Sequence, residues 1–203
     1  MWVLLLAIGS GQPSRADHLT GDTVGLNTPT VVITFDELGD LQNQVITNQF
    51  AAFGAIFENF GWDDATSGQQ TATGFFGGDL VNGFAPFPTA EPMMINFIIP
   101  VTAAAFAAVD QGGVFILSAF LGGTGGTLVD SFNITIQGST GAGFIGFANE
   151  LFDTIQISPI GQEAISIDTL QFQQTAVPEP TSILLLGTIA AGLGIFSRRR
   201  PRR

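Results

Sequence analysis

Between residues 17 and 176 the chain consists of short segments in which apolar and polar positions alternate, separated by connections rich in Gly and Pro. In residues 30–35, for example, Val31, Ile33 and Phe35 fall on one face of an extended segment. No stretch of this region has a convincing helical period longer than two turns. The alternation predicts about nine strands and favours an all-β fold, an antiparallel β-sandwich of the jelly-roll type. The expected strands are residues 30–35, 55–59, 93–99, 103–109, 114–121, 128–136, 143–147, 154–157 and 165–172.

Two glycine-rich connections divide the middle of this region. Residues 103–109 and 114–121 flank Asp-Gln-Gly-Gly, which predicts a hairpin because glycine adopts a positive φ without strain. Gly-Gly-Thr-Gly-Gly at residues 122–126 predicts a second turn. This loop lacks the G-x-G-x-x-G spacing and a following Lys, so it does not indicate a phosphate-binding loop. Pro100 is expected to end the strand at residues 93–99.

A repeated hexamer stands near each end of the β-rich region. Residues 33–38 and 165–170 share the pattern Ile, hydroxyl residue, large apolar residue, Asp, any residue, Leu. The apolar positions change phase at Asp36 and at Asp168. Because a strand has a period of two, each hexamer must contain a bulge or bend at its Asp. The first and last strands of such sandwiches often pair, so we expect Asp36 and Asp168 to come together.

Two neighbouring carboxylates in a region without Lys or Arg can be neutralised by a cation, and ligands that are all oxygen atoms suit Ca²⁺. One hypothesis is therefore a structural calcium ion held by Asp36, Asp168 and backbone carbonyl groups, with Glu37 as an extra ligand. The alternative is that both Asp side chains accept hydrogen bonds from the backbone at strand ends. The sequence leaves both interpretations open.

The character of the chain changes after residue 176. From Ser182 to Ser197 no residue is charged, and Leu, Ile, Ala and Gly predominate, which predicts a short C-terminal transmembrane helix. A buried core helix is the alternative, but the charges that follow could not enter a core. A basic cluster beside an apolar run is retained on the cytoplasmic side, so the β-rich region lies on the other side of the membrane. The cluster consists of Arg198, Arg199, Arg200, Arg202 and Arg203.

The carboxyl end resembles the PEP-CTERM sorting signal of Gram-negative bacteria that make exopolysaccharide. Its motif is Val177, Pro178, Glu179 and Pro180, followed by the apolar segment and the arginine cluster in the same order and spacing. The resemblance implies recognition by an exosortase-type membrane transpeptidase, cleavage near the motif and delivery to the cell surface or extracellular matrix. The two prolines hold the backbone extended outside the bilayer, as a protease requires. This resemblance covers residues 177–203 only.

The two hexamers carry a second resemblance. They are similar to the F-D-x-L opening and I-D-x-L closing segments of many exported PEP-CTERM proteins whose sandwiches are similar to carbohydrate-binding domains. Where such proteins often have I-D-D-L, this chain has Thr169 in place of the second Asp. One of the oxygen ligands expected from the resemblance is therefore missing.

The amino end also has the character of an export segment. The apolar run at residues 1–8 is followed by Ser14 and Ala16, whose small side chains fit a signal-peptidase site and predict a mature chain that begins at Asp17. No positive charge precedes the run, so a start upstream of Met1 is one hypothesis, and a buried first strand is another interpretation. The expected organisation is a signal peptide at 1–16, a β-sandwich domain at 17–176 and the sorting signal at 177–203.

The charges are divided between these parts. Of the 6 basic residues, Arg15 lies in the leader and the others lie in the terminal cluster, whereas all 17 acidic residues lie between Asp17 and Pro180. This strongly acidic region disfavours nucleic acid and anionic lipid as direct partners. There is no Cys, so disulfides and thiol-bound metals are excluded. An apolar content of 45% with 19 Phe predicts a folded domain held by packing.

The same composition restricts the possible chemistry. His18 is the sole histidine, and the β-rich region has no Lys, Arg or Tyr, which excludes His/Cys zinc sites, Schiff bases and phosphate clamps. Glycoside hydrolysis by two carboxylates remains, with Asp63 and Asp64 beside Trp62 as candidates. Consecutive strand residues point to opposite faces, so these acids can act together only on a loop. The simplest interpretation of Trp62, Asp63 and Asp64 is a turn with a half-buried Trp, and the next is a carbohydrate contact.

Three functions follow in order of preference. The first is a non-enzymatic exported protein, held in the inner membrane until an exosortase-type enzyme processes it, and then located at the cell surface or in the exopolysaccharide matrix. The second is a calcium-dependent carbohydrate-binding module that uses Trp62 and the neighbouring acids. The third is a carboxylate-based glycoside hydrolase.

Overall fold

The structure is a computed structural model in which residues 17–39, 41, 44–64, 77–82, 91–110, 112–136, 143–161 and 164–175 are described. These residues form strands and one short 3₁₀ helix, and every pairing between the strands is antiparallel. The elements are β1 (Asp17–Asp22), β2 (Val31–Ile33), β3 (Val45–Ile46), η1 (Ala51–Phe53), β4 (Ala55–Glu58), β5 (Phe60–Asp64), β6 (Gly78–Val81), β7 (Met93–Asp110), β8 (Val114–Leu121), β9 (Thr127–Thr135), β10 (Gly143–Pro159) and β11 (Ile165–Gln174).

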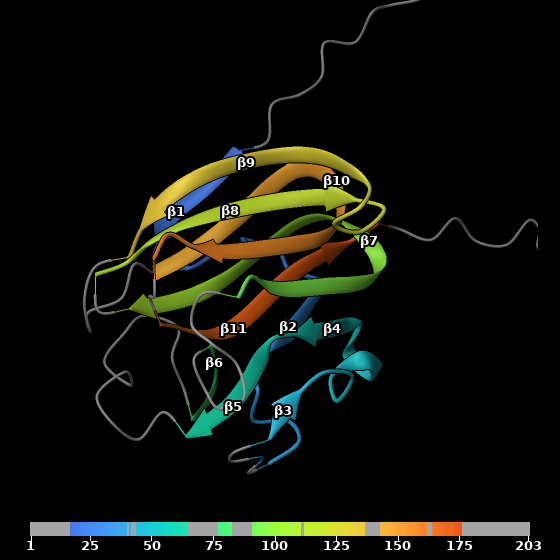
Figure 1. The fold of residues 1–203 in the computed structure, drawn as a ribbon. Coiled ribbons are helices and arrows are strands. Elements are labelled where there is room, and N and C mark those ends of the chain that lie inside the picture. Colours follow the sequence, from blue (N-terminus) through green and yellow to red (C-terminus); the bar gives the residue numbers. More distant parts are fainter. Residues whose placement is uncertain are drawn as a thin grey trace, which may run out of the picture.

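The strands form two layers that share β7 and β10 (Figure 1). Layer A begins with β1, followed by the first part of β10, the second part of β7 and then β11. The edge of β11 that faces away from β7 pairs with both β2 and β6. Beyond β6 the layer continues with β5 and β3. Layer B contains β4, the first part of β7, the second part of β10, β8 and β9. The layers face each other, because His18 of β1 stacks on Phe132 of β9 with ring centroids 4.1 Å apart. The predicted antiparallel β-sandwich is confirmed, while its jelly-roll type stays a prediction.

The two shared strands pass from one layer to the other at local irregularities. Their register changes from Thr154↔Asn96 in layer B to Ala148↔Ala103 in layer A. In β10 the change falls at Asn149, which has a φ of 64°. In β7 it falls near Pro100, which has no N–H for the ladder. We expected Pro100 to end a strand and residues 143–147 and 154–157 to form separate strands. Both expectations are wrong, because a bulge bends a strand without ending it.

The hairpin expected around residues 110–113 is also wrong. β7 pairs with β4, β10 and β11, whereas β8 pairs with β10 and β9. The connection from β7 to β8 therefore leads from layer A to layer B. A glycine-rich turn reverses the chain, but it does not determine which strand becomes the neighbour. The turn at residues 122–126 does join paired strands, β8 and β9.

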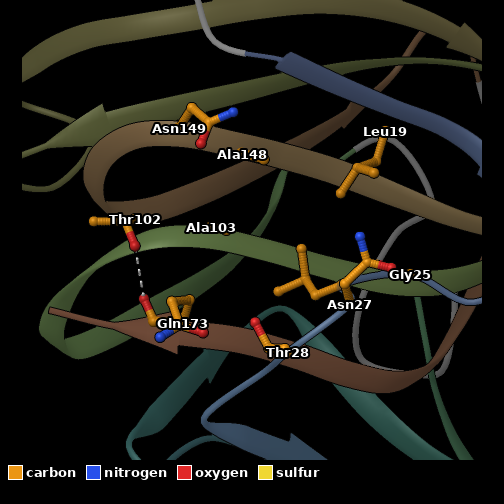
Figure 2. A pocket seen from close by; sticks show the side chains of 10 residues that line it. Leu19, Gly25, Asn27, Thr28, Thr102, Ala103, Ala148, Asn149 and Gln173 are labelled. Carbon is orange, nitrogen blue, oxygen red and sulfur yellow. Dashed lines mark hydrogen bonds between the residues drawn. The ribbon is translucent and has the colours of Figure 1, made fainter.

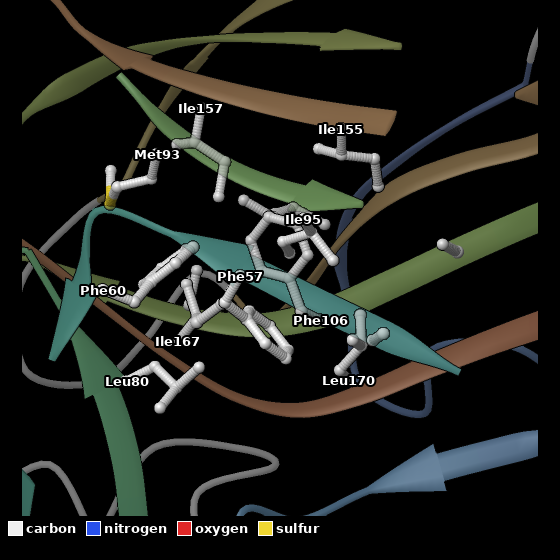
Figure 3. Close-up of a cluster of buried hydrophobic side chains, with 14 of the residues drawn as sticks. Phe57, Phe60, Leu80, Met93, Ile95, Phe106, Ile155, Ile157, Ile167 and Leu170 are labelled. Carbon is white, nitrogen blue, oxygen red and sulfur yellow. The ribbon is translucent and has the colours of Figure 1, made fainter. Parts of the chain in front are cut away.

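Phenylalanine fills the space between the layers. The ring of Phe57 lies 5.7 Å from those of Phe35 and Phe60, and both contacts are edge to face. Burying each such side chain contributes about 1.5–3 kcal/mol, and an aromatic pair adds about 0.5–1.5 kcal/mol. Figure 3 shows Phe57 and Phe60 among apolar side chains from both layers. The fully buried phenylalanines are Phe35, Phe50, Phe57, Phe60, Phe106, Phe115, Phe147, Phe152 and Phe172.

Four strands, β1, β3, β5 and β6, were not among the strands expected from the sequence. β5 and β6 lie in or beside a region rich in Gly, Thr and Gln that hides the alternation of apolar residues. β1 has the polar sequence Asp-His-Leu-Thr-Gly-Asp and pairs with β10 at the edge of layer A. An edge strand can be short and charged, so it lacks the apolar alternation on which the prediction rested. β3 has only two residues, which is too short for any period to show.

The predicted leader, sorting motif, membrane helix and arginine cluster lie outside the described residues. In the parts of the chain that the structure describes, no helix is long and apolar enough to span a membrane.

Candidate functional site

The bends predicted at the two Asp hexamers are present. In β11 the register against β7 shifts between Asp168 and Gln171, and Thr169 has a φ of 45°. Before the shift the odd-numbered residues of β11 contribute to the core, and after it the even-numbered residues do. In the first hexamer, Phe35 has a φ of 64° directly before Asp36. The change of phase in the sequence thus corresponds to a real distortion in each segment.

The two hexamers also come together, because β2 pairs with β11. The carboxylate of Asp36 accepts a hydrogen bond from the backbone N–H of Gly78 at 2.8 Å, which ties the segment after β2 to β6. Asp168 is fully buried, and its carboxylate accepts a hydrogen bond from the backbone N–H of Thr169. Both carboxylates therefore make the backbone contacts that the sequence offered as the alternative to a metal site.

Glu37 also has a local partner. Its carboxylate accepts hydrogen bonds from the backbone N–H and the hydroxyl of Thr34, at 2.7 and 3.1 Å. Among the described residues, no three His, Cys, Asp or Glu side chains are grouped so that they could hold a metal ion. Calcium binding by Asp36, Glu37 and Asp168 stays a prediction, which a thermal melt with and without a chelator tests.

Trp62 lies in the core rather than on a surface. Its side chain is 4% exposed, and its indole N–H donates to the carbonyl oxygen of Phe35 at 3.4 Å. The ring also covers Gly78, where an added Cβ would overlap with the indole. A sugar stacks on an exposed aromatic face. Trp62 therefore packs in the core on strand β5, and the simplest expectation, a half-buried Trp in a turn, is wrong. A carbohydrate contact that involves Trp62 stays a prediction.

Asp63 and Asp64 both lie on strand β5, whereas the sequence required them to lie on a loop in order to act as a pair. Directly across from Asp63 on β6 is Asp79, which is fully buried. Leu80 of β6 pairs with Ile167 of the antiparallel strand β11. Asp79 and Asp168 are the next residues along these two strands, so they occupy neighbouring positions across them. Nothing in the sequence singles out Asp79, a lone acid in a glycine-rich segment.

His18 is held in a structural position. Its Nε2 lies 3.0 Å from a carboxylate oxygen of Asp130 in β9, and its ring stacks on Phe132. The edge of the same ring faces Phe147 of β10. These contacts join the edges of the two layers. His18 is held in place by the sheet as well, because β1 pairs with β10 from Asp17 to Asp22.

The outer face of layer A has a different composition from its inner face. One row across the strands is Leu19, Gly146, Ala105 and Gln171, and the next contains Ala148, Ala103 and Gln173. The glycine and the alanines in these two rows leave room above the sheet. The chain uses part of that room itself, because residues 22–28 fold over this face.

The segment at residues 22–28 is fixed by Gln171. The amide oxygen of Gln171 accepts from the backbone N–H of Leu26 at 2.7 Å, and its amide nitrogen donates to the carbonyl oxygen of Val24 at 3.3 Å. The carboxylate of Asp22 accepts from the N–H groups of Val24 and Gly25 at 2.8 and 3.2 Å. Gly25 has a φ of 75°, and an added Cβ would lie 2.5 Å from the Gln171 amide oxygen. Only glycine fits this approach.

A polar groove of about 310 Å³ remains between this segment and the sheet. Ala103 and Ala148 form its floor, and Leu19 and Leu26 add apolar surface. The figure shows its hydrogen-bonding side chains around one hollow on strands β7, β10 and β11 and the segment before β2 (Figure 2). None of the described residues that line the groove is charged. The hydrogen-bonding side chains are Asn27, Thr28, Thr102, Asn149 and Gln173.

The groove could not be recognised in the amino-acid sequence. Its polar residues come from four separate segments and form no motif, so only the pairing of the strands brings them together. The one usable signal was the run of alanines in β7, which indicates a close approach of another segment.

A second, apolar groove of about 470 Å³ lies where η1 meets the bend of β7. Its lining includes Phe53, Ile98 and Ile99, and the Ile98 side chain is 54% exposed. Gln174, the last residue of β11, also lines it. Apolar surface therefore lies beside the place where the described part of the chain ends.

Comparison with known proteins adds little to this description. No protein-family model and no curated protein matches the chain. Among solved structures, the chain is similar to TmCBM61 in complex with β-1,4-galactotriose. The TM-score is 0.31 and the sequence identity 11%, over 60% of this chain and 83% of that one. A similarity at this level supports no inference about function.

Proposed function

We propose that the protein is a non-catalytic β-sandwich that is exported, processed through its carboxyl-terminal signal by an exosortase-type enzyme, and retained at the cell surface or in the extracellular polysaccharide matrix. The observation that carries the proposal is the order of Pro178-Glu179-Pro180, an uncharged segment and the arginine cluster. The division of charge agrees with it, because the 17 acidic residues precede that segment and most of the basic ones follow it.

The position of the sandwich supports processing at this motif. β11 ends at Gln174, three residues before the motif that begins at Val177. Cleavage near the motif would therefore leave β11 and its pairing with β7 intact. From Thr175 to Ser182 an extended chain spans at most about 25 Å. A membrane-anchored precursor would therefore hold the apolar groove at Ile98 close to the bilayer.

A non-catalytic role is supported by the positions of the candidate acids and of the histidine. Asp63 and Asp64 are consecutive residues of strand β5, and Asp79 is buried. His18 is occupied by its contacts with Asp130 and Phe132. Glycoside hydrolysis needs two carboxyl groups that face one substrate, whereas consecutive residues of a strand point to opposite faces.

The test is to express the full chain in a Gram-negative host that has an exosortase and to analyse the surface fraction by mass spectrometry. We expect a mature chain that ends near Pro180. Replacing Pro178 and Pro180 with Ala should leave the intact chain in the inner membrane. Pro201→Ala is the matched control, since it removes a proline of the same tail outside the motif, and it should be processed normally.

Two results would contradict the proposal. One is an intact chain in the cytosol that still carries Arg203. The other is normal processing of the variant that lacks both motif prolines, or normal processing in a host from which the exosortase gene has been deleted.

A further inference from the structure

We infer that the polar groove on the outer face of layer A binds a neutral, hydroxyl-rich glycan chain. This inference goes beyond the sorting proposed above and does not depend on it, because the groove is built entirely from residues 19–173 of the sandwich. It also differs from the carbohydrate contact first expected at Trp62, which lies in the core.

The chemistry of the lining favours sugar hydroxyl groups. A hydroxyl group both donates and accepts hydrogen bonds, and an Asn, Gln or Thr side chain can do the same. The groove has Asn27, Asn149 and Gln173 as amides and Thr28 and Thr102 as hydroxyl residues. Such a set can pair with a hydroxyl in either orientation. A ligand that could only accept or only donate hydrogen bonds would leave about half of the donors and acceptors of these side chains without a partner.

The charge of the protein indicates that the ligand is neutral. The chain carries a formal charge of −11, and the groove has no cationic side chain among its described lining residues. An anionic polymer would be repelled by the field of the domain and would find no compensating Lys or Arg. A cationic ligand would find no carboxylate within the lining. A neutral polysaccharide needs neither a cationic nor an anionic side chain in the groove.

The shape fits part of a chain rather than an enclosed small molecule. Asn27, Thr28 and Asn149 are exposed, so the groove is open to solvent along its rim. Its floor is made of Ala103 and Ala148, whose methyl groups form a shallow apolar surface on the sheet. Sugar rings have apolar C–H faces as well as hydroxyl edges. The volume of about 310 Å³ is at the lower end for ligand sites and holds a few sugar rings.

The groove is formed before any ligand binds. Gln171 holds the segment at residues 22–28 through two hydrogen bonds. On the opposite wall, the amide nitrogen of Asn149 donates to the carboxylate of Asp17 at 2.6 Å, which fixes the direction of that side chain. Asn149 has a φ of 64° and stands at the register shift of β10, so the backbone that carries this lining residue is fixed by the bulge. A preformed site loses less conformational entropy on binding.

The experiment measures binding of the full-length protein, in a neutral detergent, to linear hexasaccharides of glucose, mannose and galactose. Hexagalacturonate is the charged probe of equal length. We expect at least one neutral hexasaccharide to bind and hexagalacturonate not to bind. Gln173→Ala and Asn27→Ala should each raise the Kd about five- to tenfold, because each removes a hydrogen-bonding group. Asn133→Ala is the matched control: Asn133 is an exposed amide on β9 of layer B, and its loss should leave the Kd unchanged.

A second variant tests the groove without removing a polar group. Ala148→Phe should fill the floor and abolish binding while leaving all five hydrogen-bonding side chains in place. Urea unfolding of each variant shows whether it is folded under the binding conditions. Gln173→Ala and Asn27→Ala change partly exposed side chains, so they should retain the wild-type transition.

The inference is overturned if no neutral hexasaccharide binds, if only hexagalacturonate binds, or if binding is unaffected by both groove substitutions and by Ala148→Phe. These outcomes are separate from a failure of sorting. Groove variants should still be processed to a chain that ends near Pro180, and a chain that is never processed should still bind the glycan.

Discussion

The two faces of layer A have different side chains and different tasks. The inner face carries large aromatic residues, among them Phe106, Phe147 and Phe172. The outer face of the same strands carries Ala105, Ala107 and Val109, and Phe144 is its one large residue in this cluster. The side chains of the inner face pack in the core and stabilise the fold. The outer face is covered in part by residues 22–28, and the polar groove lies beside that segment. Successive residues of a strand point to opposite faces, so a substitution can be directed to one face alone.

The largest expected effect comes from the inner face. Phe147 is fully buried, and its ring lies 5.2 Å from Phe132 and 5.9 Å from Phe152. Phe147→Ala should lower the free energy of unfolding by about 3–5 kcal/mol, because it removes apolar contacts and leaves a cavity. Val32→Ala on the outer face is the control and should cost about 0.5 kcal/mol or less. Urea unfolding measures both. If both variants lose the same free energy of unfolding, the inner face does not contribute more to stability than the outer face.

The next effect concerns the close approach on the outer face. Gly146 lies in the row between Leu19 and Ala105, and an added Cβ would overlap with the backbone of Ala104 and Ala105. Gly146→Ala should therefore destabilise the fold by about 1–3 kcal/mol, as overpacking against backbone does. Gly125→Ala in the turn between β8 and β9 is the matched control, since an added Cβ there meets nothing within 4 Å. If Gly146→Ala has the stability of the control, the outer face is looser than described.

Part of this contrast could be predicted from the sequence. The change of phase at Asp36 and Asp168 predicted distortions that Phe35 and Thr169 show by their positive φ, and it predicted which residues of β11 face the core. Alternation within single strands is a local property, so a local pattern reveals it. The same reasoning located the last strand, β11, within two residues of its observed bounds.

Other features depend on contacts between distant segments, and the sequence did not reveal them. Pro100 reads as a strand end, but the pairing with β10 carries β7 past it. Trp62 next to Asp63 is typical of an exposed sugar site, yet Gly78, sixteen positions further on, gives the indole a place in the core. The polar groove joins residues 19–28 with residues 102–173. Only the register of the sheet brings those segments together.

A moderate effect should follow when the segment above the outer face is released. Gln171→Ala removes the acceptor for the Leu26 N–H and the donor to the Val24 carbonyl. Leaving these groups without their partner should cost about 1–2 kcal/mol. Amide hydrogen exchange should become faster at residues 22–28 and stay unchanged in β8 and β9. Gln173→Ala, the next amide on the same face, is the control and should leave exchange in this segment unaltered.

The smallest effect separates backbone strain from side-chain contact at the bulge where β10 leaves layer A. Asn149 has a φ of 64°, a conformation that costs most L-residues about 1 kcal/mol and glycine nearly nothing. Asn149→Ala should therefore lower the free energy of unfolding by about 1 kcal/mol, whereas Asn149→Gly should change it by less than about 0.5 kcal/mol. Both variants lose the hydrogen bond to Asp17, so its contribution cancels in the comparison. Urea unfolding of the pair gives the difference. If the two variants are equally stable, the backbone at this bulge is not strained.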